Sequence, residues 1–157
     1  MSAAGWTTAV AVALSLALAS AHAGPPQSFR ACAACHLPNA QGVPGAFPPL
    51  AGRVGPIATT LAGRRYLVGV VSFGLSGEIV VGKTTYRGFM PAQSTLSASD
   101  VATVLNYLAT ESGDAPTQSK FKPFTAAEVE QLRKTSARLT PSDVGKSRPS
   151  ALPVGKR

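Results

Sequence analysis

The segment that most constrains this chain is Cys32-Ala33-Ala34-Cys35-His36, in which two cysteines lie two residues apart and a histidine follows directly. This spacing is the pattern of c-type haem attachment. On one helical turn, two such thiols can add to the two vinyl groups of a single porphyrin. His36 is then delivered to the face of the ring, where its imidazole can bind iron. The pattern therefore predicts a chain that folds around one covalent haem c, attached through Cys32 and Cys35.

Three other interpretations of the two cysteines compete with haem attachment. A redox-active dithiol normally begins a helix of an α/β fold, and no βαβ pattern surrounds this one. A structural zinc site would need a fourth His or Cys ligand, which the exported chain would lack. A structural disulfide would close a very short loop, which limits its stabilising effect. Haem attachment is the favoured interpretation, and the two disulfide interpretations remain as alternatives.

The first 23 residues have the pattern of a secretory signal peptide. An apolar stretch from Ala9 to Ala21 is followed by Ala21-His22-Ala23, a small-x-small cleavage pattern. The stretch is shorter than the roughly 20 apolar residues that a membrane span needs. We therefore expect cleavage after Ala23 and an exported, periplasmic protein without a membrane span. The alternative is an uncleaved N-terminal anchor that faces the periplasm, because no Lys or Arg precedes the apolar stretch.

Met90 is the predicted second ligand of the haem iron. The sequence has two His and two Met residues, and loss of the signal peptide would leave only His36 and Met90. A lone methionine more often fills a gap in the core. Met90, however, lies in Gly88-Phe89-Met90-Pro91, which we expect to be a rigid loop ahead of a capped helix. A thioether opposite an imidazole raises the reduction potential of haem iron.

The periodicity of the exported chain predicts mostly helical structure. Hydrophobic residues make up 45% of the sequence and charged residues 14%, which excludes a wholly disordered chain. A short helix is expected over 29–36, an irregular loop over 37–56, a helix that begins at Pro56 and stops near Gly74 and Gly77, and a small β-hairpin over 78–86. Ser97 and Asp100 form a capping signature ahead of a helix whose buried face carries Val101, Val104, Leu105 and Leu108. Thr125 and Glu128 repeat the signature before a weaker helix.

The C-terminal third is more polar than the rest. We divide the exported chain into a haem domain over 24–110, a linker with an additional helix over 111–139, and a basic disordered tail over 140–157. Residues 133–157 hold seven basic residues and one acidic residue, and the whole chain has a net charge of +8. This balance favours redox protein partners with an acidic docking surface. Export makes a nucleic acid partner improbable.

The residues quoted so far, with several others, resemble the class I c-type cytochromes, most closely the small periplasmic monohaem domains that accompany oxidoreductases. The likeness spans residues 29–133. It departs at Phe29, which lies three rather than four residues before Cys32, at Leu37 in place of a frequent Gly, and at Arg87 in place of a frequent Asn. Pro25-Pro26 shortens the first helix, so the family's contact between first and last helices, here Phe29 with Tyr107, is an expectation only. The matching segments are 32–36, 42–52, 82–88, 90–91, 96–108 and 124–129.

The resemblance implies an all-α class I cytochrome c fold and several residues around the haem. A carbonyl of Pro48-Pro49 should accept the second ring N–H of His36. Leu50 should pack on the porphyrin. Arg53 is either the partner of a haem propionate or a solvated loop charge. Tyr66 and Tyr86 either donate to a propionate or pack in the core.

The function predicted from these residues is one-electron transfer by a monohaem cytochrome c between periplasmic redox partners. Nothing else in the chain suggests catalysis, because no second His remains for general base chemistry and no G-x-S-x-G motif is present. One alternative is a haem-bearing subunit of a periplasmic dehydrogenase or reductase complex, with residues 111–157 as its docking arm. Another is a labile Met90 that leaves an open iron for ligand sensing or peroxidase chemistry.

Overall fold

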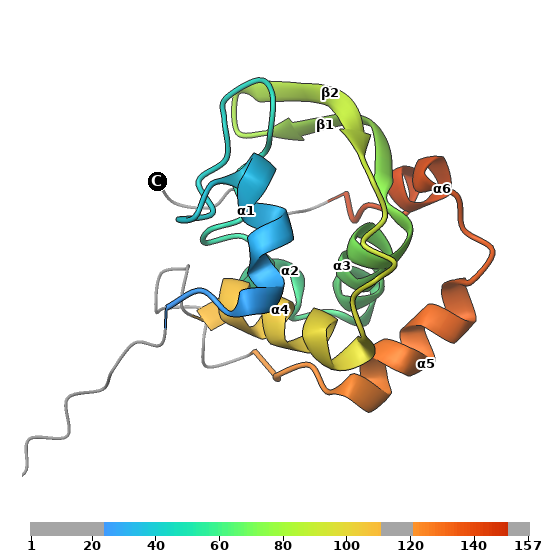
Figure 1. The fold of residues 1–157 in the computed structure, drawn as a ribbon. Helices are drawn as coiled ribbons and strands as arrows, with labels where there is room; N and C mark the ends of the chain where they lie inside the picture. The colour runs from blue at the N-terminus through green and yellow to red at the C-terminus, as the bar shows by residue number, and fades with distance from the viewer. Residues whose placement is uncertain (1–23, 111–120, 151–157) are drawn as a thin grey trace, which may run out of the picture.

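The computed structural model describes residues 24–110 and 121–150. They form a helical domain with one two-stranded sheet, which lies at one end of the domain (Figure 1). The all-α class with a small hairpin, as predicted, is confirmed. The predicted signal peptide, part of the predicted linker and the last seven residues of the predicted tail lie outside the described residues. None of the described helices is long and apolar enough to cross a bilayer.

The N-terminal helix packs against the helix that the capping signature predicted. A 3₁₀ turn, Gln27–Phe29, leads into α1, Arg30–His36, and Phe29 contacts Tyr107 of α4, Ala98–Thr110, with ring centroids 5.4 Å apart. The expected Phe29–Tyr107 contact is therefore confirmed. The Ser97 and Asp100 side chains each bond the other's backbone N–H, and the four apolar positions predicted for this helix are buried. Burial of this stripe is what attaches α4 to the core.

The helix predicted to begin at Pro56 is two helices. Pro56 lies inside α2, Val54–Ile57, and a second helix, α3, spans Leu61–Phe73. Thr60 has extended backbone and its side chain accepts the N–H of Gly63, which is how a fresh helix begins. A Cβ at Gly63 would meet the carbonyl of Ile57, so the chain turns back tightly between the two helices. The periodicity was compatible with one helix because the break inserts only three residues.

The hairpin is longer than predicted. Strands β1, Leu75–Val81, and β2, Thr84–Met90, pair antiparallel over their full length, from Leu75 opposite Met90 to Val81 opposite Thr84. Met90 is therefore the last residue of a strand, not part of a separate loop as predicted. Gly77, expected near the end of the preceding helix, and Gly88, expected in that loop, lie opposite each other within the sheet.

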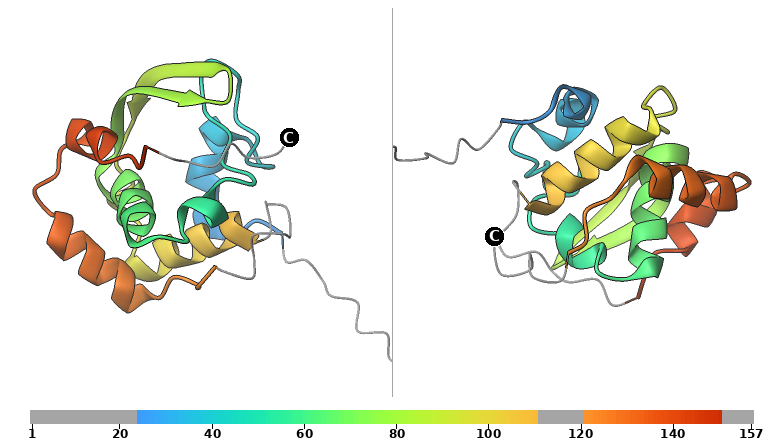
Figure 2. Two further views of the ribbon diagram at one scale, coloured as in Figure 1. Left: turned by 180° about the vertical axis from the view of Figure 1, so that it is seen from behind. Right: turned by 90° about the horizontal axis from the view of Figure 1, so that it is seen from below.

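Residues 140–150, predicted as disordered, are folded. After α5, Ala126–Ser136, the chain enters α6, Pro141–Lys146, whose capping box joins Thr140 and Asp143. Val144 is fully buried and lies over Gly69 of α3, and Gly145 lies against the carbonyl of Ser76 in β1. The two helices pass from α4 along α3 to the edge of the sheet (Figures 1 and 2). The prediction failed because one buried valine and one cap order a segment of otherwise polar composition.

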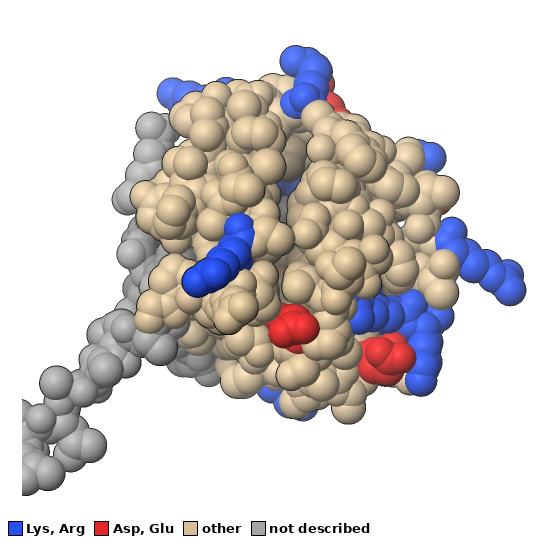
Figure 3. Space-filling model, in the orientation of Figure 1, with Lys and Arg blue, Asp and Glu red and all other residues tan. Residues whose placement is uncertain are grey.

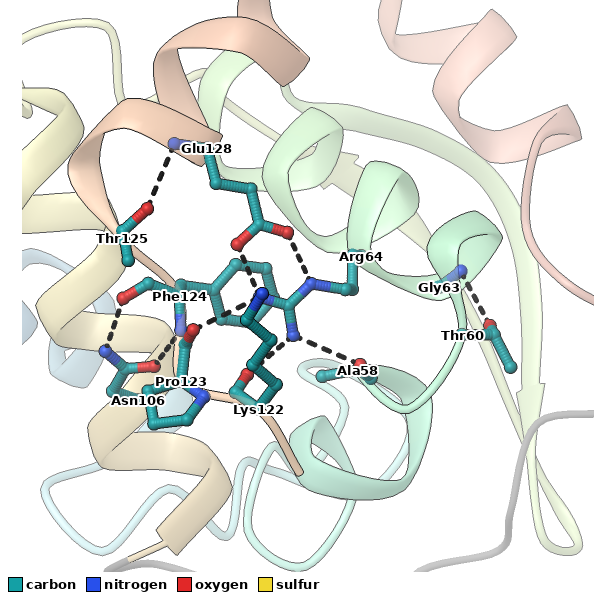
Figure 4. Close-up of polar contacts among 10 residues, drawn as sticks. All are labelled: Ala58, Thr60, Gly63, Arg64, Asn106, Lys122, Pro123, Phe124, Thr125 and Glu128. Atoms are coloured by element: carbon teal, nitrogen blue, oxygen red, sulfur yellow. Dashed lines mark hydrogen bonds and ion pairs between the residues drawn. The ribbon is translucent and has the colours of Figure 1, made fainter. Parts of the chain in front are cut away.

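A buried arginine joins the C-terminal segment to the rest of the domain (Figure 4). Arg64 of α3 pairs with Glu128 of α5 through two bonds, Nε to Oε1 at 2.5 Å and Nη2 to Oε2 at 2.6 Å. Its guanidinium also donates to the carbonyls of Ala58 and Lys122 and lies 3.8 Å from the centre of the Phe124 ring. The bidentate geometry and the burial of Arg64 make this pair stronger than an exposed one.

Replacing Glu128 by Gln should destabilise the fold by on the order of 2 kcal/mol, between the values for exposed and buried pairs. The Arg64 bonds lower the pKa of Glu128 below its ordinary 4.5. The stabilisation of the fold by these bonds is therefore complete when the pH lies above the ordinary pKa of 4.5, and it is lost as the pH falls through the lowered pKa of Glu128. Urea unfolding as a function of pH measures both effects.

Glu130→Gln is the control, because it removes an exposed carboxylate of the same helix that lies 3.8 Å from the Lys134 ammonium. It should lower the free energy of unfolding by less than about 0.5 kcal/mol. Equal losses in the two variants would contradict the assigned role of the pair.

Candidate functional site

The described part of the molecule contains a cleft whose walls come from separate parts of the chain. One side is made by α1 and the loop that follows it, and the other by the β1–β2 hairpin and α3. Two adjoining hollows share His36 and Met90 in their lining. The groove is visible in the space-filling view, where mostly uncharged atoms form its rim (Figure 3).

His36 is held in one orientation at the C-terminal end of α1. Its ring is buried, and its Nδ1 lies 2.8 Å from the carbonyl oxygen of Pro48, which confirms the predicted acceptor. The carbonyl can only accept, so Nδ1 carries the proton and Nε2 has its lone pair available. Burial lowers the pKa of His36, with the Pro48 bond opposing it. A neutral, oriented imidazole is the form that binds a metal.

The two cysteines lie on α1 with no disulfide between them. Cys35 lines the cleft beside His36, whereas Cys32 is buried one turn earlier against the core. Burial raises the pKa of the Cys32 thiol. The disulfide alternatives therefore find no support in the geometry, and no group of three or more His, Cys, Asp or Glu that could hold a metal ion occurs in the described part of the chain.

Met90 reaches the cleft from the hairpin. It is half-buried at the end of β2, and it lines both hollows together with His36. The backbone around it is fixed on both sides, because Met90 pairs with Leu75 and Gln93 N–H donates to the carbonyl of Val71 at 2.8 Å. Imidazole and thioether thus face one apolar space.

The second of the two hollows, which we call the inner end of the cleft, has a mostly apolar lining that includes two arginines, Arg53 and Arg148. Pro49, Leu50 and the buried Tyr66 also line it, whereas the buried Tyr86 lines the other hollow. Arg53 is only 8% exposed, so it is not a solvated loop charge. Its Nη1 makes one long bond of 3.4 Å to the Pro49 carbonyl, and its Nε has no partner in the described structure. Such an unpartnered buried donor is costly and indicates an acceptor that the chain does not itself supply.

Other residues of the cleft were not predicted from the sequence. Phe47 and Phe89 line its mouth, and Leu75 and Ile79 of β1 form its wall. Arg148, from the segment predicted as disordered, lines the inner end. The apolar residues carry no local signal that separates them from ordinary core positions.

The cleft fits a haem. The walls are apolar, an imidazole nitrogen and a thioether sulfur face the space, one thiol lies in its lining with the second on the same helix, and an unpartnered guanidinium lies at the inner end. These are the groups that an iron porphyrin with vinyl and propionate substituents would engage.

Comparison with known proteins agrees with this geometry. The family model described as "Cytochrome c" matches residues 23–112. The chain is 46% identical over 127 residues to cytochrome c-552 from one strain of Thermus thermophilus, covering 81% of this chain and 84% of the relative. It is 47% identical over 116 residues to a second Thermus thermophilus cytochrome c-552, covering 74% of this chain and 87% of that protein.

Proposed function

Because this chain belongs to the cytochrome c family, whose members bind covalent haem c and transfer electrons, we propose that Cys32 and Cys35 attach its haem and that His36 and Met90 are the axial ligands. The protein is an electron-transfer protein rather than an enzyme. When bound, the haem supplies a one-electron iron couple. The observation that carries the proposal is that His36 and Met90, from opposite walls, line the same apolar cleft.

Each residue of the cleft has a defined task under this proposal. The Pro48 carbonyl holds the proton on Nδ1 of His36 and so keeps Nε2 available as a ligand. The hairpin presents the Met90 sulfur, and Leu50, Leu75 and Ile79 exclude water from the space between the two ligands. With both ligands supplied by the chain and water excluded, these residues would leave no position for a substrate, and a bound haem would supply electron transfer alone.

The C-terminal segment supports a self-contained carrier over a permanent subunit. A docking arm should project from the domain, whereas α5 and the described part of the segment after it fold back onto α3, α4 and β1. The firmly held backbone at Met90 likewise favours a fixed ligand over the labile one that a sensor or peroxidase needs.

The proposal also includes export of the chain and a redox partner with an acidic surface. The small-x-small pattern at Ala21-His22-Ala23 supports cleavage and a periplasmic location. The net charge of +8 supports attraction of an acidic redox partner, and the face that holds the groove carries more basic than acidic side chains (Figure 3). The electron would leave through the mouth of the cleft, where Phe47 and Phe89 are exposed.

Met90→Ala should abolish the weak near-infrared band of ferric iron bound to a thioether. It should also lower the reduction potential by on the order of 0.1 V, a part of the roughly 0.8 V range that axial ligands cover. Phe89→Ala, which removes an exposed neighbour from the same strand, is the control and should keep the band. Optical spectra and a redox titration of the purified haem protein measure both effects. A band that survives in Met90→Ala would show that another group is the ligand.

A further inference from the structure

The end of α6 returns the chain to the cleft. The chain turns at Ser147 after the helix, and Arg148 Nη2 then donates to the carbonyl of Val80 in β1 at 2.9 Å. This bond holds the Arg148 side chain across the hairpin. The guanidinium lines the inner end of the cleft, where Arg53 also lies.

Two positive side chains thus share one small space. No ion pair of the described residues includes Arg53 or Arg148. Burial, and then the charge of Arg148, lower the pKa of Arg53, as expected for two like charges that line one hollow. Burial raises the pKa of Tyr66, with Arg148 and Arg53 opposing it, so a phenol O–H lies beside the same pair.

Such an arrangement is unfavourable unless an anion occupies it. Buried like charges without a counterion destabilise a fold, and a fold retains them when a bound group offsets the repulsion. The guanidinium fork matches a carboxylate, which it binds through parallel hydrogen bonds. The unpartnered Nε of Arg53 is a donor left over for that purpose.

We propose that Arg148, together with Arg53, binds a propionate carboxylate of the haem, so that the C-terminal segment is part of the cofactor site. The inference rests on the proposed haem site. It adds a residue far along the chain to the groups that hold the haem, and it assigns α6 the task of placing that residue.

Arg148→Gln and Lys146→Gln make a matched pair, because each removes one positive charge from the same segment and Lys146 is largely exposed. Acid–acetone extraction first establishes that both variants carry covalent haem; absence of covalent haem from the unaltered protein would instead overturn the proposed function. A positive charge beside the cofactor favours the reduced iron. Arg148→Gln should therefore shift the redox equilibrium toward ferric iron by up to about tenfold, or about 59 mV for one electron. Lys146→Gln should leave the equilibrium unchanged.

The second readout is specific to the carboxylate. With haem labelled with ¹³C at the propionate carboxyl carbons, the redox-difference infrared spectrum of Arg148→Gln should show a shifted carboxylate band, and that of Lys146→Gln should not. Arg148→Lys keeps the charge but loses the two parallel donors of the guanidinium, so it should shift the band and largely keep the reduction potential. It also serves as the test variant if Arg148→Gln yields no folded protein.

Arg53→Gln combined with Arg148→Gln should change the reduction potential by less than the sum of the two single effects. An unchanged band and potential in Arg148→Gln and Arg148→Lys, with only a loss of thermal stability, would overturn the proposal and leave Arg148 as an anchor to Val80.

Discussion

Replacing both Cys32 and Cys35 by Ala should remove covalent haem altogether, and replacing either one should reduce the yield of haem protein to a small fraction. The chain has no other cysteine that could substitute. Each single variant can form only one thioether bond and so leaves one vinyl group unsaturated. The reduced pyridine haemochrome spectrum measures this, because its α band moves to longer wavelength when a vinyl group is retained. Acid–acetone extraction measures the covalent attachment itself.

Ala34→Ser is the matched control for this experiment. Ala34 lies between the two cysteines and is exposed, so the substitution keeps both thiols and their spacing on α1. It should yield haem protein with two thioether bonds. Haem that stays on the polypeptide of the double variant after extraction would refute attachment through these residues.

Gly74→Ala should destabilise the fold by on the order of 3 kcal/mol or more and weaken the Met90 band at the same time. Gly74 ends α3 with φ 84° and ψ −179°, a conformation that is essentially restricted to glycine. A Cβ there would lie 2.6 Å from the carbonyl oxygen of Met90 and 3.0 Å from the nitrogen of Ala92. Both are backbone atoms, so the clash can be relieved only by moving the strand that holds Met90.

Gly77→Ala separates backbone strain from the clash. Gly77 also has a positive φ, 106°, but a Cβ there would meet nothing within 4 Å. It should cost about 1–2 kcal/mol, the ordinary penalty of a left-handed conformation, and keep the near-infrared band. Urea unfolding and the ferric optical spectrum of the two variants decide the matter. Equal destabilisation, or an intact band in Gly74→Ala, would show that the backbone around Met90 is not held by this contact.

The haem cofactor could be predicted from the sequence because the attachment motif depends on local spacing. Cys32, Cys35 and His36 share one helical turn, and the capping pairs that begin α4 and α5 span three residues each. The Pro48 carbonyl was found through a family resemblance, because nothing local says which carbonyl meets His36. Met90 was predicted as a ligand by elimination among side chains that can bind iron, and that role stays a prediction. The strand that presents it was expected to be a loop.

The C-terminal segment was not predictable in the same way. Thr140 and Asp143 carry a capping signature like that of Ser97 and Asp100, but no apolar stripe follows it. The helix packs through Val144 over Gly69, and that contact joins residues far apart in sequence. The Arg64–Glu128 pair and the approach of Arg148 to Val80 span 64 and 68 residues. A polar composition favours disorder until such partners are known.

The loop at the far end of the hairpin determines which residue of β2 faces the cleft beside His36. Gly82-Lys83 joins the strands as a two-residue loop, and this loop places Val81 opposite Thr84 and hence Leu75 opposite Met90. Side chains alternate between the two faces of a strand, so a loop longer by one residue would shift the register of β2 and turn the Met90 side chain to the other face of the hairpin. Neither residue of the loop lies in the lining of the cleft, yet the length of the loop is a condition for the proposed thioether ligation. The proposed ligand therefore depends on the length of the chain as well as on the type of residue.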